Sequence, residues 1–379
     1  MKCFPVPDTR NIDLGVSVGT RLTIRLPDDF HHHCRDGLKT KTVLQHACLR
    51  VGRCLMMPNT NPPITTTEMA LEYKQHILRS MPDDQNYPNF EPLMVLYLTD
   101  KTKAEEITKA HAAGIVGVKF YPAGATTNSD FGVTDIQNCY GALRELDRLN
   151  MMLCIHSEVT HADIFEREPI FIEEIMKPLA DDFPNLKMTM EHISTMDAVD
   201  YVLSASDNIK ASITCHHLLY NRNDMLVGGI KPHLYCLPIL KSESHRQALV
   251  KAAISGSPKF FLGTDSAPHS RDAKESCCGC AGVFTAHALL ELYTETFDKH
   301  GQLSKLEDFC SSFGADHYGL PRNTATLTLE KTSWKVPMSY DFGDDLYLRG
   351  LRAGEEIKWK LVEEETGNKK KPKLDQQSV

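Results

Sequence analysis

The sequence predicts an α/β fold, a (β/α)8 TIM barrel in which parallel strands alternate with crossover helices. Two observations support this fold class. Eight short apolar or β-branched runs occur in order, and most of the gaps between them show helical periodicity. A strand followed by a helix, repeated eight times, matches the number of units that closes such a barrel. A doubly wound open sheet, which uses the same alternation, is the main alternative.

Each predicted strand is a short run rich in aliphatic residues, as expected for parallel strands buried on both faces. In order, the strands are Arg21–Leu26, Cys54–Met57, Leu93–Leu98, Gly117–Tyr121, Met152–Ile155, Leu186–Met190, Lys210–Cys215 and Lys259–Gly263. The gaps place apolar residues at helical spacing, most clearly in Thr67–Met81, Lys103–Ala113, Asn138–Leu149 and His245–Ile254. After the last strand, the pattern predicts two further helices, Ala281–Phe297 and Lys305–Phe313.

The chain of 379 residues is long enough for one large barrel domain. We predict a single catalytic domain over residues 1–362, with residues 1–20 as an N-terminal extension that packs on it. Strand-like alternation in Asp345–Leu361 is expected to lie near that N-terminal segment. Residues 363–379 are polar and charged, which favours a disordered tail. Their KKKPK run fits a solvated tail better than a nuclear signal.

Composition and charge narrow the function classes. The net charge of −8 argues against a nucleic-acid-binding surface, which needs a basic face. No apolar run approaches the roughly 18 residues of a transmembrane helix, and the first residues do not resemble a secretory signal. The 12 cysteines are scattered, many of them in apolar strands, as expected for reduced thiols. We therefore expect a cytoplasmic protein that binds neither nucleic acid nor membranes.

Metal-ligating residues follow several of the predicted strands directly. His31 and His33 stand at i and i+2, so their rings point to the same side of a strand. A lone buried histidine is usually a packing residue, but in a barrel the carboxyl ends of all strands converge on one face. The strand-end residues are His31, His33, His156, His192 and Asp265. Their convergence predicts a metal-dependent hydrolase.

Lys119 stands among aliphatic residues on the fourth predicted strand. A buried ammonium beside metal cations is unfavourable, because burial and like-charge repulsion both oppose it. Reaction of the neutral amine with CO2 gives a carbamate, whose two oxygens are able to bridge two metals. The alternative is a lysine that extends to the rim of the barrel and keeps its ammonium in water.

Several long motifs, ordered along the chain, carry a resemblance to a known family. They are HHHCRDG, MMPNTNPP, VGVKFYPAGATTNS, HSEVTHADI, EHIST, NRNDMLVGG, KPHLYCLPILK and LGTDSAPHSRDAKESCCGCAG. With these motifs the chain resembles the dihydroorotases, in the shorter monofunctional bacterial-type class (class II) of the amidohydrolase superfamily. The resemblance covers about residues 21–361. It implies a homodimer and the reversible cyclisation of N-carbamoyl-L-aspartate to L-dihydroorotate, the third step of pyrimidine biosynthesis.

The resemblance also implies a binuclear zinc site, with two Zn2+ per subunit. The first zinc is expected on the outer two histidines of the HHH motif, on Asp265 and on carboxylated Lys119. The second is expected on the other carbamate oxygen, His156 and His192. A hydroxide would bridge the metals, and Asp265 would act as general base and acid. Two metals roughly 3.5–4 Å apart lower the pKa of a bridging water and polarise a carbonyl, which agrees with this chemistry.

The free carboxylate of such a substrate requires a cationic group, although the chain is acidic. Arg35 follows the histidine pair by two residues and is therefore expected on the same side of the strand. The resemblance adds Asn59 and His269 as the partners of Arg35 in binding this carboxylate. It also places the backbone of Leu237 and Ala281 on the substrate ring.

A polar loop, Gly124–Val133, follows the lysine-bearing strand and is rich in Gly, Thr, Asn and Ser. Such a composition suits a mobile lid. In the resembling family, paired threonines close over the bound substrate, and these correspond to Thr126 and Thr127 here. An ordinary loop whose threonines make local hydrogen bonds is the alternative.

Two positions differ from the family pattern, in which apolar residues are usual. His32 and Cys34 alternate with the metal-binding histidines and are expected to point away from the metals. A one-residue slip that makes His32 a ligand is the alternative. Cys277–Cys280 lacks the spacing of paired CxxC motifs, so reduced thiols are favoured over a third metal site. His216 and His217 receive no ligand role.

Two other functions compete with this interpretation. Another cyclic-amide hydrolase, such as a hydantoinase or an allantoinase, would share the metal site. Such an enzyme is not expected to share the carboxylate site of Arg35, Asn59 and His269. A catalytically dead scaffold barrel would have lost metal ligands, yet every ligand position here holds a competent residue.

Overall fold

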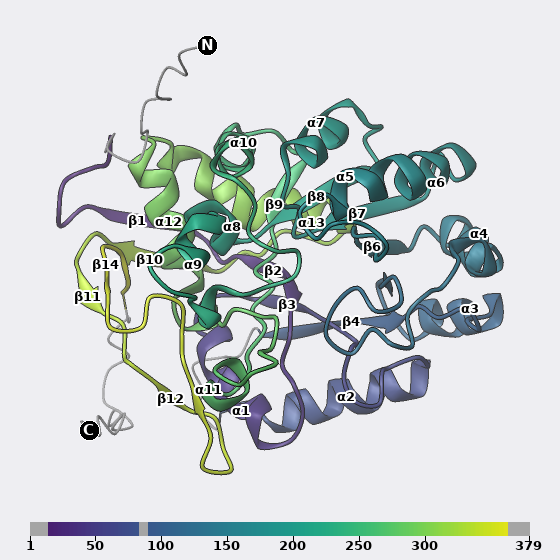
Figure 1. The fold of residues 1–379 in the computed structure, drawn as a ribbon, viewed down its shortest axis with the longest axis horizontal. Helices are drawn as coiled ribbons and strands as arrows, with labels where there is room; N and C mark the ends of the chain where they lie inside the picture. The colour runs from purple at the N-terminus through teal and green to yellow at the C-terminus, as the bar shows by residue number, and fades with distance from the viewer. Residues whose placement is uncertain (1–13, 83–89, 363–379) are drawn as a thin grey trace.

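The computed structural model describes residues 14–82 and 90–362. Its centre is a sheet of eight parallel strands in which each strand pairs with the next along the chain, which confirms the predicted barrel (Figure 1). The strands are β2 (Asp28–His32), β3 (Arg53–Met56), β4 (Glu91–Tyr97), β5 (Gly117–Phe120), β6 (Met152–His156), β7 (Lys187–Glu191), β8 (Ile209–Ile213) and β9 (Phe260–Leu262). The predictions for residues 1–13 and for the tail from residue 363 lie outside the described residues.

The barrel closes between its first and last strands at their carboxyl ends. His32 forms a parallel bridge with Ser266, and the Asp265 amide donates to the His31 carbonyl at 2.9 Å. The His33 amide donates to the Ser266 carbonyl at 3.2 Å. The predicted metal-binding residues of β2 and of the segment after β9 are therefore brought together by the closure itself.

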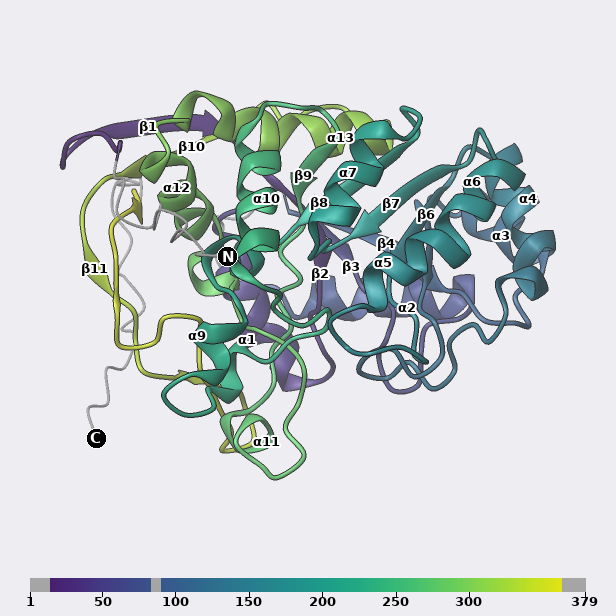
Figure 2. The ribbon, with the colours of Figure 1, turned by 45° about the horizontal axis from the view of Figure 1, so that its top comes forward.

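The predicted first strand was wrong. Arg21–Leu26 corresponds to β1 (Arg21–Arg25), which lies outside the barrel and pairs antiparallel with β10 (Thr326–Glu330) (Figure 2). The first barrel strand is β2, whose sequence DDFHH carries charges that a hydropathy pattern treats as exposed. All five residues are nevertheless buried, because the charges are paired. Arg53 on β3 donates two hydrogen bonds to the Asp28 carboxylate, at 2.8 and 2.6 Å.

The remaining strands are short and lie outside the barrel. β15 (Lys360–Leu361) pairs with the other edge of β10, so the end of the described chain shares a sheet with β1. This arrangement agrees with the expectation that the end of the chain lies near the N-terminal segment. The others form two-stranded pairs: β11 (Trp334–Lys335) with β14 (Glu356–Ile357), and β12 (Tyr340–Asp341) with β13 (Tyr347–Leu348).

Helices surround the barrel strands (Figures 1 and 2). Threonines begin three of the described helices: Thr66 accepts a hydrogen bond from the Met69 amide, Thr195 from the Ala198 amide, and Thr214 from the His217 amide. The helices are α1 (Leu38–Ala47), α2 (Thr67–Arg79), α3 (Ala104–Ala112), α4 (Tyr140–Arg148), α5 (Arg167–Phe171), α6 (Lys177–Asp182), α7 (Met196–Ser204), α8 (Cys215–Leu219), α9 (Arg222–Leu226), α10 (Glu243–Ile254), α11 (Arg271–Lys274), α12 (Leu289–Lys299) and α13 (Phe313–Tyr318).

The first helix predicted after the last barrel strand begins later than expected. Ala281–Phe297 was predicted as one helix, whereas α12 begins at Leu289. Val283 and Phe284 are extended, because they bridge Ser266 and Gly350, and a 3-10 turn over Ala286–Ala288 leads into α12. The second predicted helix, Lys305–Phe313, corresponds to a π-helical turn that leads into α13.

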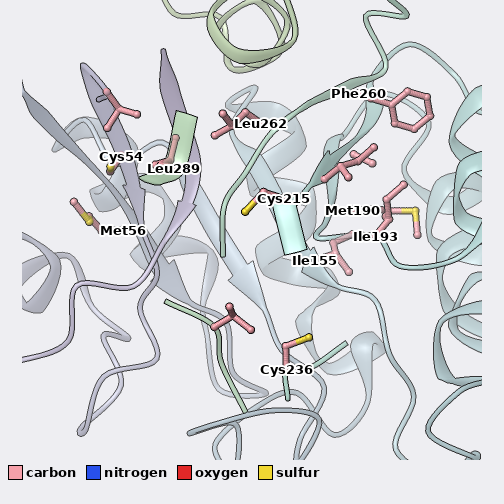
Figure 3. Close-up of a cluster of buried hydrophobic side chains, with 14 of the residues drawn as sticks. Cys54, Met56, Ile155, Met190, Ile193, Cys215, Cys236, Phe260, Leu262 and Leu289 are labelled. Atoms are coloured by element: carbon pink, nitrogen blue, oxygen red, sulfur yellow. The ribbon is translucent and has the colours of Figure 1, made fainter. Parts of the chain in front are cut away.

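Two buried clusters fill the space inside and outside the barrel. Cys54 and Met56 of β3 belong to the outer cluster, between strands and helices (Figure 3). Leu55 and Met57, which alternate with them, belong to the inner cluster. The inner cluster is closed by α13, where Tyr318 stacks on Phe30 with ring centroids 4.5 Å apart. The interior is therefore filled at the end near α13, and the carboxyl ends of the strands are left for polar residues.

None of the described helices has both the length and the apolar character that a membrane-crossing helix requires.

Candidate active site

A cavity lies at the carboxyl ends of the barrel strands. Most of the residues predicted from the sequence line it. The lining residues are His31, His33, Arg35, Asn59, Tyr121, Thr126, Thr127, His156, His192, Asp265, Ala267, Ala281 and Gly282. Three predicted residues, Lys119, Leu237 and His269, are not part of this lining.

A register shift in β2 brings His31 to the cavity. Between Asp29 and His32 the pairing with β3 slips, so that Phe30 joins the inner cluster and His31 also reaches the barrel interior. The Asp29 carboxylate stabilises this bend, because one oxygen accepts from the His31 amide at 3.2 Å and from the Thr264 amide at 2.8 Å. The same carboxylate contacts the His32 ring at 2.7 Å, which turns that ring away from the cavity.

Four imidazole rings and one carboxylate meet in the cavity. The ring centroids lie 5.3 Å apart for His31 and His33, 4.9 Å for His31 and His192, and 4.8 Å for His156 and His192. Asp265 Oδ1 lies 3.3 Å from His31 Nε2 and 3.0 Å from His33 Nε2. One ligand atom from each of His31, His192 and Asp265 falls within 4.8 Å of the others. Nitrogen and oxygen donors at this density suit a divalent transition metal.

The protonation states of these groups also suit a metal. Burial lowers the pKa of His33 to about 3 and lowers the pKa values of His156 and His192. Burial alone would raise the pKa of Asp265, but His31 and His33 face its carboxylate and hold the pKa below its ordinary value. Neutral imidazoles and an ionised carboxylate are the forms that coordinate metals.

The backbone is strained at three of these positions. His192, Asp265 and Arg35 have φ angles of 43°, 45° and 62°, in the left-handed region that non-glycine residues rarely adopt. Such strain is concentrated at functional sites, where the surrounding structure holds it in place. The strain therefore supports a functional role for this end of the barrel.

Two carboxylates that were not predicted from the sequence contact ring nitrogens of His31 and His156. Glu191 Oε2 lies 2.8 Å from His31 Nδ1, and Glu158 Oε2 lies 2.7 Å from His156 Nε2. Because a carboxylate only accepts, the contacted ring nitrogen carries the proton and the opposite nitrogen is free for a metal. Their proximity to the predicted ligands in the sequence could have identified them: Glu191 directly precedes His192, and Glu158 follows His156 by two residues.

Lys119 lies behind the cavity wall and is fully buried. Its Nζ has no hydrogen-bond partner among the described residues and sits 5.0 Å from the centroid of the Tyr121 ring. Burial lowers the pKa of Lys119, which favours the neutral amine. The alternative of a lysine whose ammonium reaches water does not match this burial. His192 Nδ1 is also buried and has no hydrogen-bond partner within residues 14–82 and 90–362. Unpaired donors and acceptors of this kind fit residues whose partner is a metal or a group bound to it.

Of the predicted carboxylate-binding residues, Arg35 and Asn59 line the cavity, and His269 lies outside the lining in contact with Arg35. Arg35 Nη2 is 3.0 Å from His269 Nε2, and Arg35 Nε donates to the Pro268 carbonyl at 2.9 Å. His269 Nε2 is also 3.0 Å from the Ala281 carbonyl, so a neutral ring satisfies one of these two contacts at a time. Burial lowers the pKa of His269 to about 2, which keeps the ring neutral.

The loop predicted to be a lid lies over the cavity. Thr127 Oγ1 donates to the Ala281 carbonyl at 3.4 Å, and the Thr127 carbonyl accepts from Asn59 Nδ2 at 3.0 Å. Asn128 Nδ2 in turn donates to the Asn59 carbonyl at 2.9 Å. Asn59 thus contacts the loop, and the loop connects Asn59 with the Ala281 carbonyl.

Several residues considered from the sequence are not brought into the cavity. Leu237 is half-buried outside the lining. Cys277 and Cys278 are exposed, with their sulfur atoms 3.8 Å apart. His217 is buried and bonded through its ring to Thr214 and to the Pro238 carbonyl.

Comparisons with known proteins agree with this geometry. The model of the amidohydrolase family matches residues 29–353. A dihydroorotase from Vibrio parahaemolyticus is 57% identical over 345 residues, which cover 90% of this chain and 99% of the relative. The solved dihydroorotase of Campylobacter jejuni is 33% identical with a TM-score of 0.84, covering 92% of this chain and 99% of its own. The solved dihydroorotase of Saccharomyces cerevisiae is 30% identical with a TM-score of 0.82, covering 90% of this chain and 98% of its own. The chain therefore belongs to the amidohydrolase superfamily and, within it, to the dihydroorotases.

Proposed function

We propose that this protein interconverts N-carbamoyl-L-aspartate and L-dihydroorotate in the cavity described above. Dihydroorotase activity, a step of pyrimidine biosynthesis, follows from the close homology. One structural observation carries the proposal: four histidines and Asp265 converge beside a buried lysine whose amine has no hydrogen-bond partner in the described part of the chain. The yeast relative was solved with 5-fluoroorotic acid, a ring compound with a carboxylate like dihydroorotate.

We further propose that the site holds two Zn2+ per subunit. His31, His33 and Asp265 would hold one ion, His156 and His192 the other, and carboxylated Lys119 would bind both. The buried, unpaired Lys119 Nζ and His192 Nδ1 support this set of donors. When bound, the two ions would lower the pKa of a water and polarise the substrate carbonyl.

Asp265 is the residue that moves the proton. Its carboxylate lines the cavity and is held ionised by the two histidines that face it. In ring opening, a water oxygen bonds to the ring carbonyl carbon and the C–N bond breaks. Asp265 takes one proton from the water and delivers it to the departing nitrogen. The second proton of the water is released, because the product carries one more carboxylate than the ring.

Arg35, Asn59 and His269 would bind the substrate's free carboxylate. The Arg35 guanidinium is a planar donor that matches a carboxylate, and its contacts with His269 and with the Pro268 carbonyl hold it at the cavity wall. Thr126 and Thr127 would close over the bound ring, as their place in the cavity lining supports.

Turnover of both compounds by the purified protein, at acidic and at alkaline pH, tests the proposal. Because closure consumes a proton, we expect the equilibrium to favour L-dihydroorotate at low pH and N-carbamoyl-L-aspartate at high pH. Chelation should abolish turnover, and zinc with bicarbonate should restore it. The isosteric variant Asp265→Asn should lose on the order of 10³-fold or more in kcat, since it removes the proton acceptor and a proposed zinc ligand together.

Absence of turnover by the metal-loaded protein would refute the assigned substrate. Hydantoins and allantoin are then the next substrates to test, because a hydantoinase or an allantoinase would share the metal site. Inactivity toward all of them, with metal bound, would favour a scaffold. The homodimer stays a prediction from the family resemblance, and sedimentation of the purified protein tests it.

A further inference from the structure

The cavity wall formed by Cys280–Gly282, called the Ala281 wall below, connects the predicted carboxylate-binding residues with the lid. Ala281 and Gly282 line the cavity. The Ala281 carbonyl lies 3.0 Å from His269 Nε2 and accepts from Thr127 Oγ1 at 3.4 Å. A shift of this wall would therefore displace a substrate-binding group and the lid together. Whatever holds the wall in place contributes to the shape of the substrate site.

Lys274, at the end of α11, makes the contacts that hold this wall. Its side chain is buried, and Nζ donates to the carbonyls of Tyr235, Cys280 and Gly282 at 2.8, 2.6 and 2.8 Å. An ammonium has three N–H donors, and all three are used here. Two of the three acceptors flank Ala281, so the single cation holds the wall on both sides of that residue.

The third acceptor belongs to the segment that faces the Ala281 wall. Tyr235 lies two residues before Leu237, whose backbone is expected on the substrate ring. The Tyr235 carbonyl also accepts from the Gly282 amide at 3.0 Å, so it receives one hydrogen bond from the wall and one from Lys274. Lys274 thus lies between the two backbone segments that the family resemblance assigns to the ring.

We propose that Lys274 is a positioning residue that sets the separation between the Ala281 wall and the Tyr235–Leu237 segment for the ring-shaped substrate. This inference rests on the proposed function and adds a residue to it. Hydrogen bonds from an ion are stronger than those between neutral groups, so one ammonium fixes three backbone positions. Burial lowers the pKa of Lys274 to about 8, which leaves the ammonium as the main form at neutral pH.

Lys259 provides a matched control on the same chain. It is buried, and its Nζ donates to the carbonyls of Ala205, Ser206 and Ile209 at 2.9, 2.7 and 3.3 Å. Each lysine therefore donates to three backbone carbonyls, and Lys259 also lies 3.5 Å from the exposed Asp207 carboxylate. Lys259 lies just before β9, where the barrel strands begin, and is remote from the cavity. A general effect of losing a buried ammonium should appear when either lysine is replaced. An effect on substrate binding should appear only when Lys274 is replaced.

The test compares Lys274→Met, Lys259→Met and Lys274→Arg in the zinc-loaded protein. Hydrogen–deuterium exchange of the peptide spanning residues 275–283 reports the order of the wall without substrate. Steady-state kinetics with L-dihydroorotate measures KM and kcat and so reports substrate binding and turnover at the site. We expect Lys274→Met to raise exchange in this peptide and to raise KM about tenfold or more, with kcat within about threefold, because charged hydrogen bonds are lost from the ground-state site. Lys259→Met should change neither the exchange of this peptide nor KM. Lys274→Arg, which keeps a cation, should show exchange and KM values close to those of the wild type.

Unchanged exchange or unchanged KM in folded Lys274→Met would overturn the proposal, as would an equal effect of Lys259→Met. If Lys274→Met does not fold, Lys274→Gln, which keeps two N–H donors, replaces it in the same comparison. Failure of the proposed function is distinguishable, because wild-type protein would then show no turnover. The exchange comparison would still decide whether Lys274 holds the wall.

Discussion

At the scale of single residues, two carboxylates contact histidines that we propose as metal ligands. Glu191 contacts His31 at 2.8 Å and also accepts from Ser212 Oγ at 2.8 Å. These contacts fix the position of the carboxylate and, through it, the ring orientation of His31. Glu158 does the same for His156. Partners of this kind raise the basicity of the histidine and lower the entropy lost on metal binding.

We predict that Glu191→Gln weakens zinc binding. The amide keeps the size of the side chain but removes the charge that supports the His31 proton, so the affinity should fall by roughly 10- to 100-fold. Competition against a chromogenic chelator measures this affinity directly. Glu330→Gln, at an exposed ion pair with Arg21, is the control and should bind zinc like the wild type. Equal affinities in the two variants would contradict the orienting role of Glu191.

At the scale of elements, loops that end at the cavity are joined to each other by side chains. The lid contacts the Ala281 wall through Thr127 and contacts Asn59 through the Thr127 carbonyl. Tyr97 at the end of β4 supports the same loop, because its hydroxyl donates to the Asn128 carbonyl at 3.1 Å. The loop predicted to be a lid is therefore held by contacts with Ala281, Asn59 and Tyr97.

We predict that Thr127→Val raises KM for L-dihydroorotate by about tenfold, because the valine keeps the shape of the side chain but removes its hydroxyl. Thr134→Val is the matched control. Thr134 follows the same loop, and its hydroxyl donates to the exposed Asp100 at 2.6 Å, outside the cavity. Initial-rate kinetics on both variants measures the difference. A KM for Thr127→Val within twofold of that for Thr134→Val would show that the lid contact does not contribute to binding.

At the scale of the whole molecule, the fold buries several histidines in neutral form away from the cavity. His46 lies in an aromatic cluster beside Phe284 and Tyr340. His317 contacts the Met188 carbonyl and Thr189 beneath the barrel. Burial lowers the pKa of each to about 3. In the unfolded chain both would titrate near the ordinary value of about 6.5.

These shifts predict acid sensitivity of the metal-free protein. Below pH of about 6.5 the unfolded chain binds protons at His46 and His317 that the folded chain does not, so stability falls as pH decreases toward about 3. Each histidine contributes about 1.4 kcal/mol per pH unit across this window. Urea unfolding at a pH near 7.5 and near 5 measures the loss. His317→Gln should reduce the pH dependence, whereas His161→Gln, at an exposed position, should leave it unchanged.

An equal urea midpoint at both pH values would contradict this prediction. So would a pH dependence of His317→Gln that matches that of the wild type.

The sequence by itself determined the barrel and most of the residues that line its cavity. Strand and helix periodicities are local properties, and side chains at the carboxyl ends of parallel strands meet whatever the details of packing. The histidines, Asp265 and Arg35 could therefore be placed together before any contact was known. Their metal and substrate roles stay predictions from the resemblance and from this convergence.

Tertiary structure alone decided the first barrel strand and the partners of the site residues. The charges of β2 look exposed in a hydropathy pattern, and only the pairing of Asp28 with Arg53 makes their burial possible. The register shift that turns His31 inward depends on Asp29 meeting Thr264, far along the chain. Such pairings depend on contacts between segments that are distant in the sequence. Sequence patterns, in contrast, report the local conformational preferences of residues that are adjacent in the chain.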